Sequence, residues 1–378
     1  MPLDSISAEF DHCIKCGLCL ATCPVSKELL LEKYTPRGRV QLARFYSQGV
    51  LDLSDQYWDI FAKCLLCGAC SVTCPSGVDL KQVLFGMREQ LAKKRGFHPM
   101  MKRAMESLAS NHNISESDNS ERGDWVDFLD NIPSHGYQKE KADVVYFVGC
   151  VAAFFPMVQT IPESFAQILE FAKVNFTILA DEEWCCGFPL IGAGLPEKLE
   201  ELKANNIAKI KALGAKTVVF SCPSCYWTWK EHYDTDFELF HSVQFIEKLI
   251  VDEKIQLGEV STAVTYHDPC DLGRNSGIFD APRRILKSIP GLTFTELESN
   301  QAQSVCCGGG GNLEMTDPVL SGKIAQMKIA EIQQTGASIV VTSCQQCVRT
   351  MRRSARLQKV DLKVMDMTEL VLHAISKD

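Results

Sequence analysis

Two short cysteine motifs with the same spacing constrain this chain more than any other feature of its sequence. "CIKCGLCLATCP" begins at Cys13 and "CLLCGACSVTCP" begins at Cys64, an offset of 51 residues. Each reads C-x2-C-x2-C-x3-C-P, so four thiols stand within eleven residues. Thiols at this spacing suit metal ligation better than a disulfide framework. The N-terminal part of the chain is therefore predicted to fold around metal.

The motif spacing is typical of two-cluster bacterial ferredoxins, where three cysteines of one motif and the fourth of the other bind each [4Fe-4S] cube. The predicted ligands of one cube are Cys13, Cys16, Cys19 and Cys74. Those of the other are Cys64, Cys67, Cys70 and Cys23. Zinc ribbons, the alternative, use two separated cysteine pairs. The sequence thus predicts two cubane [4Fe-4S] clusters.

The connection between the two motifs is long and helical in character. Thr35 is placed to cap a helix that has Pro36 at its first position, and Gly49 is the expected stop. Ser54 is placed to cap a second helix over "SDQYWDIFAKC". These features predict an all-helical ferredoxin-like domain over residues 1–95. The polar, turn-rich stretch 96–142 is predicted to be a linker with a short helix near "DWVDFLDNI".

The remaining ten cysteines form a second repeat of two quintets. The first quintet is Cys150, Cys185, Cys186, Cys222 and Cys225; the second is Cys270, Cys306, Cys307, Cys344 and Cys347. Offsets between equivalent members run 120, 121, 121, 122 and 122 residues. Flanking segments repeat too, since "DVVYFVGC" matches "AVTYHDPC" and "GAKTVVFSCPSC" matches "GASIVVTSCQQC". The agreement predicts a duplication, with half-domains at 143–260 and 261–378.

Each half has the pattern of an α/β fold. "VVYFV", "TVVFS", "AVTYH" and "IVVTS" are short β-rich runs of the kind found in buried parallel strands. A helix ending at Gly214 or Gly336 precedes the last of these strands in each half. The cysteines follow strand ends, where ligands of open α/β sheets bind. The fold class is therefore α+β multidomain: an all-helical two-cluster ferredoxin domain followed by two pseudo-symmetric α/β halves.

The adjacent cysteines at 185–186 and 306–307 bear on the kind of metal bound. Five thiolates converge in each half, and a single tetrahedral zinc would leave one of them over. Neighbouring sulfurs can bind different irons of a cluster, or one sulfur can bridge two. Gly187 and the run Gly308–Gly311 are expected to let the backbone approach a bulky inorganic core. A vicinal disulfide switch and a zinc site with a spare cysteine remain the alternatives.

At these residues the chain resembles the cysteine-rich CCG domain family, whose pattern is a cysteine, a Cys-Cys-Gly and a Cys-x-x-Cys. With the ferredoxin module in front, it is similar to the fused type seen in the D subunit of heterodisulfide reductase. Glycolate oxidase iron-sulfur subunits and the C subunit of anaerobic glycerol-3-phosphate dehydrogenase share this layout. The resemblance implies a noncubane [4Fe-4S] cluster at each quintet, two in addition to the cubes. The flanks differ, "CCGFP" against "CCGGGG", which implies clusters of different potential and exposure.

Two further groups of residues are candidates for a role at the site. His267, three residues before Cys270, is interpreted as a structural histidine at a strand end, with a proton donor or a partner of a metal ligand as the alternative. An aromatic group follows "CPSC" and is expected to pack in the core or to cover the cluster, with a docking surface as the alternative; its members are Tyr226, Trp227, Trp229 and Tyr233. No residue is assigned a catalytic role.

Composition excludes several classes of function. The net charge of −8 and the pI near 5.6 argue against a nucleic-acid-binding surface. The N-terminus lacks the basic and apolar regions of a signal peptide, so a reducing cytoplasm is expected. The longest apolar run, 144–158, is too short to span a membrane. Any membrane contact is then peripheral, on the inner face of the cytoplasmic membrane.

Three functions are compatible with this sequence. The favoured hypothesis is an electron-transfer subunit of a hetero-oligomer, which passes single electrons between a flavoprotein dehydrogenase and a quinone, another carrier or a membrane subunit. The partner would oxidise a 2-hydroxy acid such as glycolate or lactate, or glycerol 3-phosphate. The chain has no flavin or nicotinamide motif of its own. The alternative is a catalytic subunit that cleaves a disulfide at a noncubane cluster, and a redox sensor is the third hypothesis.

Overall fold

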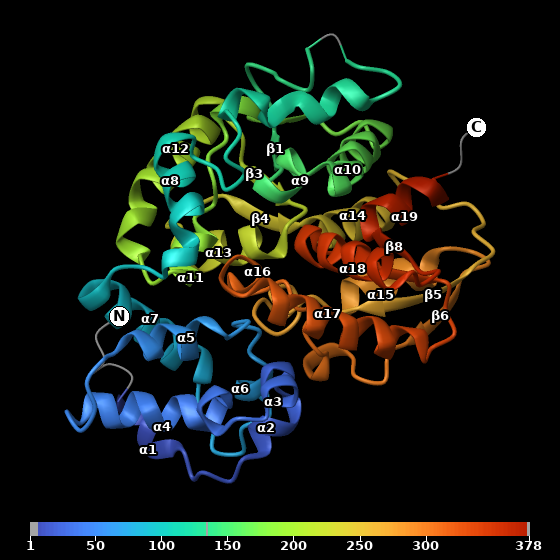
Figure 1. Ribbon diagram of the computed structural model, residues 1–378. Helices are drawn as coiled ribbons and strands as arrows, with labels where there is room; N and C mark the ends of the chain where they lie inside the picture. Colours follow the sequence, from blue (N-terminus) through green and yellow to red (C-terminus); the bar gives the residue numbers. More distant parts are fainter. Residues whose placement is uncertain (1–6, 134, 376–378) are drawn as a thin grey trace.

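The N-terminal module is a bundle of short helices around the two cysteine motifs. The computed structural model describes residues 7–133 and 135–375 of the chain. Among the described residues up to Arg95 there is no β-strand, which agrees with the all-helical prediction. The helices are α1 (Ser7–His12), α2 (Leu18–Thr22), α3 (Pro24–Leu29), α4 (Pro36–Ser47), α5 (Asp55–Ala62), α6 (Ala69–Val72) and α7 (Leu80–Arg95) (Figure 1).

Helix boundaries in this module follow local chemistry. Thr35 caps α4, because its hydroxyl accepts a hydrogen bond from the Gly38 amide at 2.9 Å. The helix ends two residues before Gly49, whose φ of 70° lies in the left-handed region that glycine favours. Ser54 occupies the N-cap of α5 as expected, although its side chain makes no capping hydrogen bond. Both predicted helices are therefore confirmed.

Residues 96–142 carry more structure than their polar composition indicates. Helix α8 (Lys102–Ser110) buries Ala104, Met105 and Leu108, and a 3-10 segment, η4 (Asn119–Phe128), lies where the sequence predicts a short helix. Trp125 in η4 is fully buried against the first α/β half. The buried apolar residues of α8 recur at helical spacing, so this helix is amphipathic and the linker prediction missed it.

Two four-stranded parallel sheets form the rest of the molecule. The first has the order β2-β1-β3-β4 and the second the order β6-β5-β7-β8. Equivalent strands occupy equivalent places, so the topology has the duplication that the cysteines predict. The strands are β1 (Val144–Phe147), β2 (Phe176–Thr177), β3 (Thr217–Phe220), β4 (Glu238–His241), β5 (Ala263–His267), β6 (Thr293–Glu296), β7 (Ile339–Thr342) and β8 (Lys363–Asp366).

Helices flank each sheet and also join the two halves. Helix α10 packs against α19, and α14 packs against α15, so the halves bury apolar side chains against each other. The helices of this region are α9 (Cys150–Phe154), α10 (Thr160–Phe171), α11 (Phe188–Gly192), α12 (Leu199–Ala212), α13 (Pro223–His232), α14 (Ser242–Val251), α15 (Asp280–Ser288), α16 (Leu313–Thr316), α17 (Pro318–Gln333), α18 (Gln345–Gln358) and α19 (Met367–Ala374).

Polar contacts fix the orientation of the two halves. The amide of Gln345, from the second half, donates to the Val148 carbonyl at 2.7 Å and to the Ser221 hydroxyl at 2.8 Å. Its oxygen accepts from the Ala152 amide at 3.0 Å. Gln345 is fully buried, so a buried glutamine of one half satisfies groups of the other.

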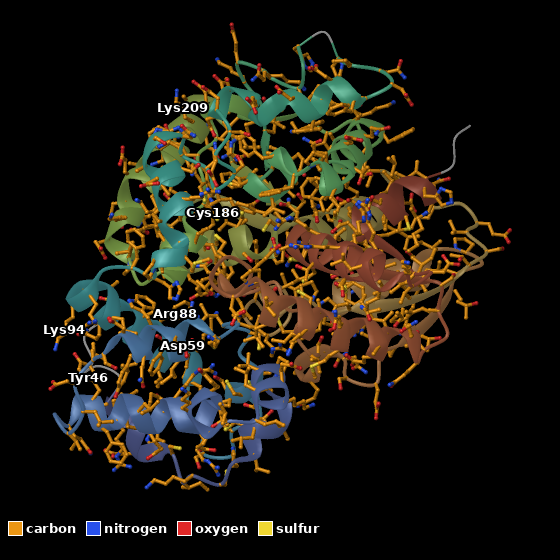
Figure 2. The ribbon with its side chains drawn as sticks, in the orientation of Figure 1. Tyr46, Asp59, Arg88, Lys94, Cys186 and Lys209 are labelled. Atoms are coloured by element: carbon orange, nitrogen blue, oxygen red, sulfur yellow. The ribbon has the colours of Figure 1, made fainter. Side chains whose placement is uncertain are left out.

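One buried arginine joins the ferredoxin module to both halves. Arg88 of α7 donates hydrogen bonds to five backbone carbonyls and is labelled where the three regions meet in Figure 2. Three acceptors belong to the ferredoxin module, and two belong to the α/β halves: Phe61, Ala62 and Cys64, then Gly192 at 2.8 Å and Gly311 at 3.0 Å. Because all five carbonyls are satisfied by one guanidinium, the three parts of the chain meet in a single fixed arrangement.

Close backbone approach explains the glycines at this junction. A Cβ on Gly311 would lie 2.4 Å from the Cys64 carbonyl oxygen, and one on Gly187 would lie 2.0 Å from Cδ1 of Leu199. The sequence predicts that these glycines admit an inorganic core. The structure shows that Gly311 makes room for the backbone of the ferredoxin module and Gly187 for the Leu199 side chain, while access for a cluster stays a prediction. None of the described helices is long and apolar enough to cross a membrane.

Candidate metal centre

The first cavity of the ferredoxin module contains the predicted cysteine set. Cys13, Cys16, Cys19 and Cys74 all line it, so three cysteines of the first motif meet the last cysteine of the second. The Val78 amide donates to the Cys74 sulfur at 3.4 Å, as expected for backbone amides that face cluster ligands. Cys16 is the exposed member of the set, which places this cavity at the surface of the module.

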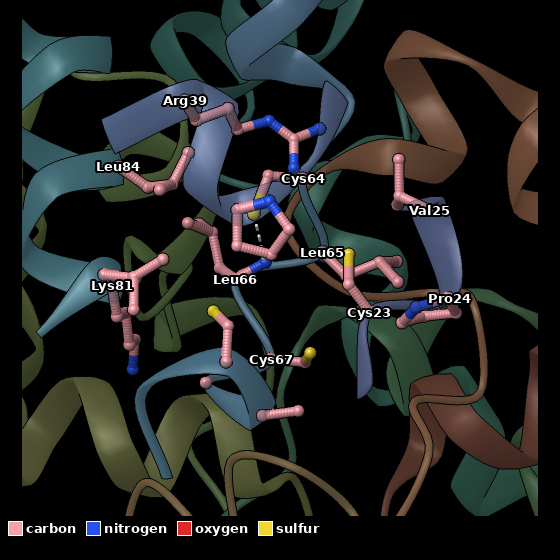
Figure 3. Close-up of a pocket in the computed structure, with 15 residues that line it drawn as sticks. Cys23, Pro24, Val25, Arg39, Cys64, Leu65, Leu66, Cys67, Lys81 and Leu84 are labelled. Atoms are coloured by element: carbon pink, nitrogen blue, oxygen red, sulfur yellow. Dashed lines mark hydrogen bonds between the residues drawn. The ribbon is translucent and has the colours of Figure 1, made fainter. Parts of the chain in front are cut away.

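The second cavity contains the other predicted set (Figure 3). Its lining includes Cys23, Cys64, Cys67 and Cys70. The Leu66 amide donates to the Cys64 sulfur at 3.4 Å. The two motifs are 51 residues apart in sequence, but α2 packs against α6, so the fourth cysteine of each motif lies beside the first three cysteines of the other. The structure therefore brings together the four thiols of each predicted set, and their role as cluster ligands stays a prediction.

The donor chemistry of these cavities fits iron-sulfur clusters. All eighteen cysteines are free, although several lie in contact with other thiols. Hydrogen bonding from Cys306 lowers the pKa of Cys67 to about 6, whereas burial raises the pKa of Cys70 well above its usual value. Crowded thiols without disulfides repel one another once ionised, and bound cations remove that repulsion. Four converging thiols per cavity match the ligand demand of a cube.

Nine of the ten remaining cysteines line one cavity of about 370 Å³ between the two α/β halves. All five members of the first quintet line it, together with Cys270, Cys307, Cys344 and Cys347 of the second. Cys150 and Cys222 follow directly after β1 and β3, and Cys270 and Cys344 follow β5 and β7. The placement beyond the carboxyl ends of the strands is thus confirmed. The sequence does not indicate that both quintets face the same cavity.

Hydrogen bonds between thiols run in the same order in each half. In the first half they connect Cys150 to Cys185, Cys185 to Cys186, and Cys186 to Cys225. Those from Cys185 and Cys225 lower the pKa of Cys186 to about 6. The equivalent residue in the second half is Cys307. Hydrogen bonding with Cys306, and then with Cys347, lowers the pKa of Cys307 well below its usual value. The second cysteine of each adjacent pair is therefore poised as a thiolate, the form that binds metal.

Cys306 connects the second quintet with the ferredoxin module. Its thiol hydrogen-bonds to Cys67, one of the predicted cube ligands, as well as to Cys270. Arg274 lies at the same junction, where it donates to the Cys67 carbonyl at 2.7 Å. Predicted ligands of the inner cube and of the second quintet are therefore in direct contact, which gives electrons a short route between the two sites.

A buried ion pair supports the first quintet and is not apparent from the sequence. Arg122, in η4, donates to the Cys150 sulfur at 3.4 Å and pairs with Glu183 at 2.7 Å, and both side chains are 1% exposed. Glu183 also accepts from the Val148 and Gly149 amides at 2.8 Å. Burial alone would lower the pKa of Arg122, but Cys150 and Glu183 raise it, so it stays cationic. Arg122 lies in the predicted linker, where no motif marks it.

His267 lies beside the second quintet. One of its ring nitrogens and the sulfurs of Cys307 and Cys347 all lie within 4.8 Å of one another, and all three residues are buried. Burial lowers the pKa of His267, which favours the neutral imidazole. This position at the end of β5 agrees with the prediction of a strand-end histidine, and it also brings the ring within reach of a predicted ligand's sulfur.

The predicted aromatic group packs in the core. Tyr226, Trp227, Trp229 and Tyr233 are all buried, and the Tyr233 hydroxyl donates to the Cys186 carbonyl at 3.2 Å. Because burial leaves no exposed ring face, these residues pack in the core and do not form a docking surface. This confirms the favoured interpretation of the group.

The cavity wall combines apolar and charged side chains. Ile114, Phe155, Phe188 and Met315 line it, and two arginines of α18 line it beside them. Arg349 pairs with Glu314 at 2.8 Å and lies over the Phe155 ring, and Arg353 approaches the same carboxylate at 3.4 Å. Two cations thus share the Glu314 carboxylate, and Asp271 is the second carboxylate that lines the cavity.

Known protein families share this arrangement of cysteines. Residues 144–230 and 264–352 match the family described as "Cysteine-rich domain" (CCG), and residues 9–78 match the "4Fe-4S dicluster domain". The chain is also 31% identical to the heterodisulfide reductase D subunit of Methanosarcina mazei, over 97% of this chain and 94% of that protein. The chain belongs to the CCG family. It is an iron-sulfur oxidoreductase subunit with a ferredoxin module fused to two CCG halves.

The chain is also similar to further oxidoreductase subunits and, in fold, to one solved structure. The chain is 27% identical to the B subunit of fumarate reductase (CoM/CoB) from Methanothermobacter marburgensis, over 97% of this chain and 72% of that protein. It is 25% identical to EtfAB:quinone oxidoreductase of Syntrophomonas wolfei, over 85% of this chain and 47% of that protein. A hypothetical protein from Helicobacter pylori has a similar fold, with a TM-score of 0.57 at 12% identity, covering 92% of this chain and 69% of that one.

Proposed function

We propose that this chain is the catalytic iron-sulfur subunit of a hetero-oligomeric oxidoreductase and reduces a disulfide in the cavity between the two CCG halves. The observation that supports this most is the shared cavity: nine of the ten CCG cysteines line one space of about 370 Å³. Clusters held by these cysteines would occupy part of this space, and both would then face a substrate that enters it. The similarity to the D subunit of heterodisulfide reductase supports disulfide as the substrate class.

The cysteines would hold four [4Fe-4S] clusters: two cubes in the ferredoxin module and one noncubane cluster at each quintet. These clusters supply one-electron transfer when bound. The Cys306–Cys67 contact joins the ferredoxin module to the second quintet. The exposed Cys16 marks the surface at which a partner protein would deliver electrons.

The reaction that this site supports is RSSR + 2e⁻ + 2H⁺ → 2RSH. The sulfur-sulfur bond breaks, the partner supplies both electrons, and each sulfur takes up a proton. The apolar side chains of the wall exclude water from the bound disulfide. Arg349 and Arg353 would orient a substrate that carries a carboxylate, sulfonate or phosphate, because one positive charge of the pair is not neutralised by Glu314.

Anaerobic turnover with a reduced viologen dye tests this function. We expect disulfide-dependent oxidation of the dye by the isolated, fully iron-loaded chain. Arg349→Gln should raise KM for an anionic disulfide at least several-fold and leave KM for a neutral one, such as bis(2-hydroxyethyl) disulfide, unchanged. Arg356→Gln, an exposed change on the same helix, is the control. No turnover of any disulfide by fully loaded protein would refute the proposal.

A second candidate is an electron carrier between a flavoprotein dehydrogenase and a quinone. It is favoured by the similarity to EtfAB:quinone oxidoreductase and by the lack of any flavin or nicotinamide motif in the sequence. The two candidates differ in where chemistry occurs. If a flavoprotein encoded nearby reduces this chain and the chain then reduces a quinone analogue but no disulfide, the carrier role holds. Failure to accept electrons from such a flavoprotein would remove it.

A further inference from the structure

His267 is a buried imidazole whose ring nitrogens have no nitrogen or oxygen hydrogen-bond partner among the described residues, and whose polar interaction is with the Cys307 thiol. It is 1% exposed, at the end of β5. Buried side-chain nitrogens are nearly always paired in folded proteins, so an imidazole that meets only a thiol requires an explanation. His241, the other histidine at a strand end, differs, because its Nδ1 accepts from the Val243 amide and caps α14.

The surroundings of His267 are those of a metal site. A ring nitrogen and the Cys307 and Cys347 sulfurs all lie within 4.8 Å of one another. Metal–sulfur and metal–nitrogen bonds are about 2.3 and 2.0–2.1 Å at zinc sites, so two ligands of one metal stand roughly 3–4 Å apart. The three atoms can therefore reach a common metal with small side-chain rotations.

The equivalent position in the first half cannot bind metal. The 120-residue offset between Cys150 and Cys270 pairs His267 with Phe147. Phe147 is fully buried and packs against the rings of Phe220 and Trp229, with centroids 5.4 and 5.5 Å away. One half thus has a packing residue where the other has a nitrogen donor.

The contacts of Cys306 are a second difference between the two halves. The Cys306 thiol forms a hydrogen bond with Cys67 of the ferredoxin module. Cys306 does not line the shared cavity, whereas its equivalent in the first half, Cys185, does. The second half therefore directs one sulfur of its quintet toward the inner cube. A nitrogen donor on the opposite side, next to Cys307 and Cys347, would complete the ligand set of the centre.

We propose that His267 is a nitrogen ligand of the metal centre in the second CCG half. The second centre is then a mixed cysteine and histidine site, while the first is bound by cysteine alone. Neutral imidazole adds less negative charge than thiolate, and histidine ligation raises the potential of Rieske centres above that of cysteine-bound [2Fe-2S] ferredoxins. The second centre should accordingly have the higher potential of the two. This inference rests on the iron-sulfur content of the proposed function.

Pulsed EPR on protein labelled with ¹⁵N-histidine tests the ligand directly. Partly reduced, iron-loaded protein should show a histidine nitrogen coupling on one cluster signal. His267→Phe, which copies the first half, should lose the coupling and shift that signal to a lower midpoint potential. His241→Asn, the buried control, should retain both. Absence of the coupling from a cluster signal of the second half, or its persistence in His267→Phe, would overturn the proposal.

Iron content separates this test from that of the proposed function. If loading stops at about eight irons, the noncubane clusters are refuted. Co²⁺ then serves as the probe of the same three residues. Visible absorption bands of bound Co²⁺ that change in His267→Phe but not in His241→Asn would support nitrogen ligation. Unchanged bands would overturn it.

Discussion

Arg88 provides the sharpest test of how the ferredoxin module is joined to the CCG halves. Its guanidinium donates to the carbonyls of Gly192 and Gly311, one in each half, at 2.8 and 3.0 Å. Burial lowers the pKa of Arg88 to about 10, so the side chain is still protonated at neutral pH. Hydrogen bonds to charged groups contribute roughly 1.5–3 kcal/mol each. Two such bonds across the junction contribute about 3–6 kcal/mol.

Arg88→Met keeps much of the side-chain length and removes every donor. We expect urea unfolding of the anaerobic protein to show a loss of at least about 3–6 kcal/mol, because the Phe61, Ala62 and Cys64 carbonyls lose their donor as well, or a split into two transitions. Hydrogen exchange should accelerate in α11 and in the loop 308–312, which contact the module. Arg95→Met, at the exposed end of the same helix, should change stability by only about 0.5 kcal/mol. A single transition within about 1 kcal/mol of the native protein would refute this role of Arg88.

Three further predictions concern the ligands, the junction and pH. Cys74→Ser should remove about four irons and abolish the EPR signal of the cube predicted to be bound by the first motif, while the signal of the other cube remains. Loss of the other cube's signal instead would contradict the prediction that each motif's fourth cysteine binds the cube of the other motif. Gly311→Ala should destabilise by about 1–3 kcal/mol in urea, because its Cβ meets the Cys64 carbonyl, whereas Gly322→Ala, with open space, should be neutral or stabilising. Burial raises the pKa of Asp366 to about 7 from 3.8, so the folded state holds its proton more tightly and stability falls as pH rises through that window. Asp366→Asn should flatten the dependence of the urea midpoint on pH between about 4 and 7, and an unchanged slope would contradict this.

Local sequence patterns predict most of the fold and the cysteine groups. The fourth cysteine of each motif, Cys23 or Cys74, meets the first three cysteines of the opposite motif. The spacing predicts this, because the geometry of a cube restricts how three thiols of a short loop can bind it. The strands of both halves follow from short β-branched runs, and the offsets of 120–122 residues indicate the duplication that the shared strand order displays. These features depend on neighbouring residues or on repeats, and both are visible in one sequence.

The features that the sequence does not reveal depend on tertiary packing. Whether the quintets face one cavity or two is decided by how α10 and α14 of the first half pack on α19 and α15 of the second, and periodicity within one helix does not specify its partner. Arg122 reaches Cys150 from a segment that looks like a linker, because the chain returns across the first half there. The predicted role of Gly311 is access for a cluster, whereas the neighbour that requires it is the Cys64 carbonyl.

Iron and sulfide analysis of anaerobically prepared protein, combined with EPR, tests the central claim of four clusters most directly. Four [4Fe-4S] clusters require about sixteen irons and sixteen sulfides per chain. We expect these values, with separate signals from two cubes and two noncubane centres. About eight irons, with signals from the cubes alone, would contradict the assignment of clusters to the CCG cysteines.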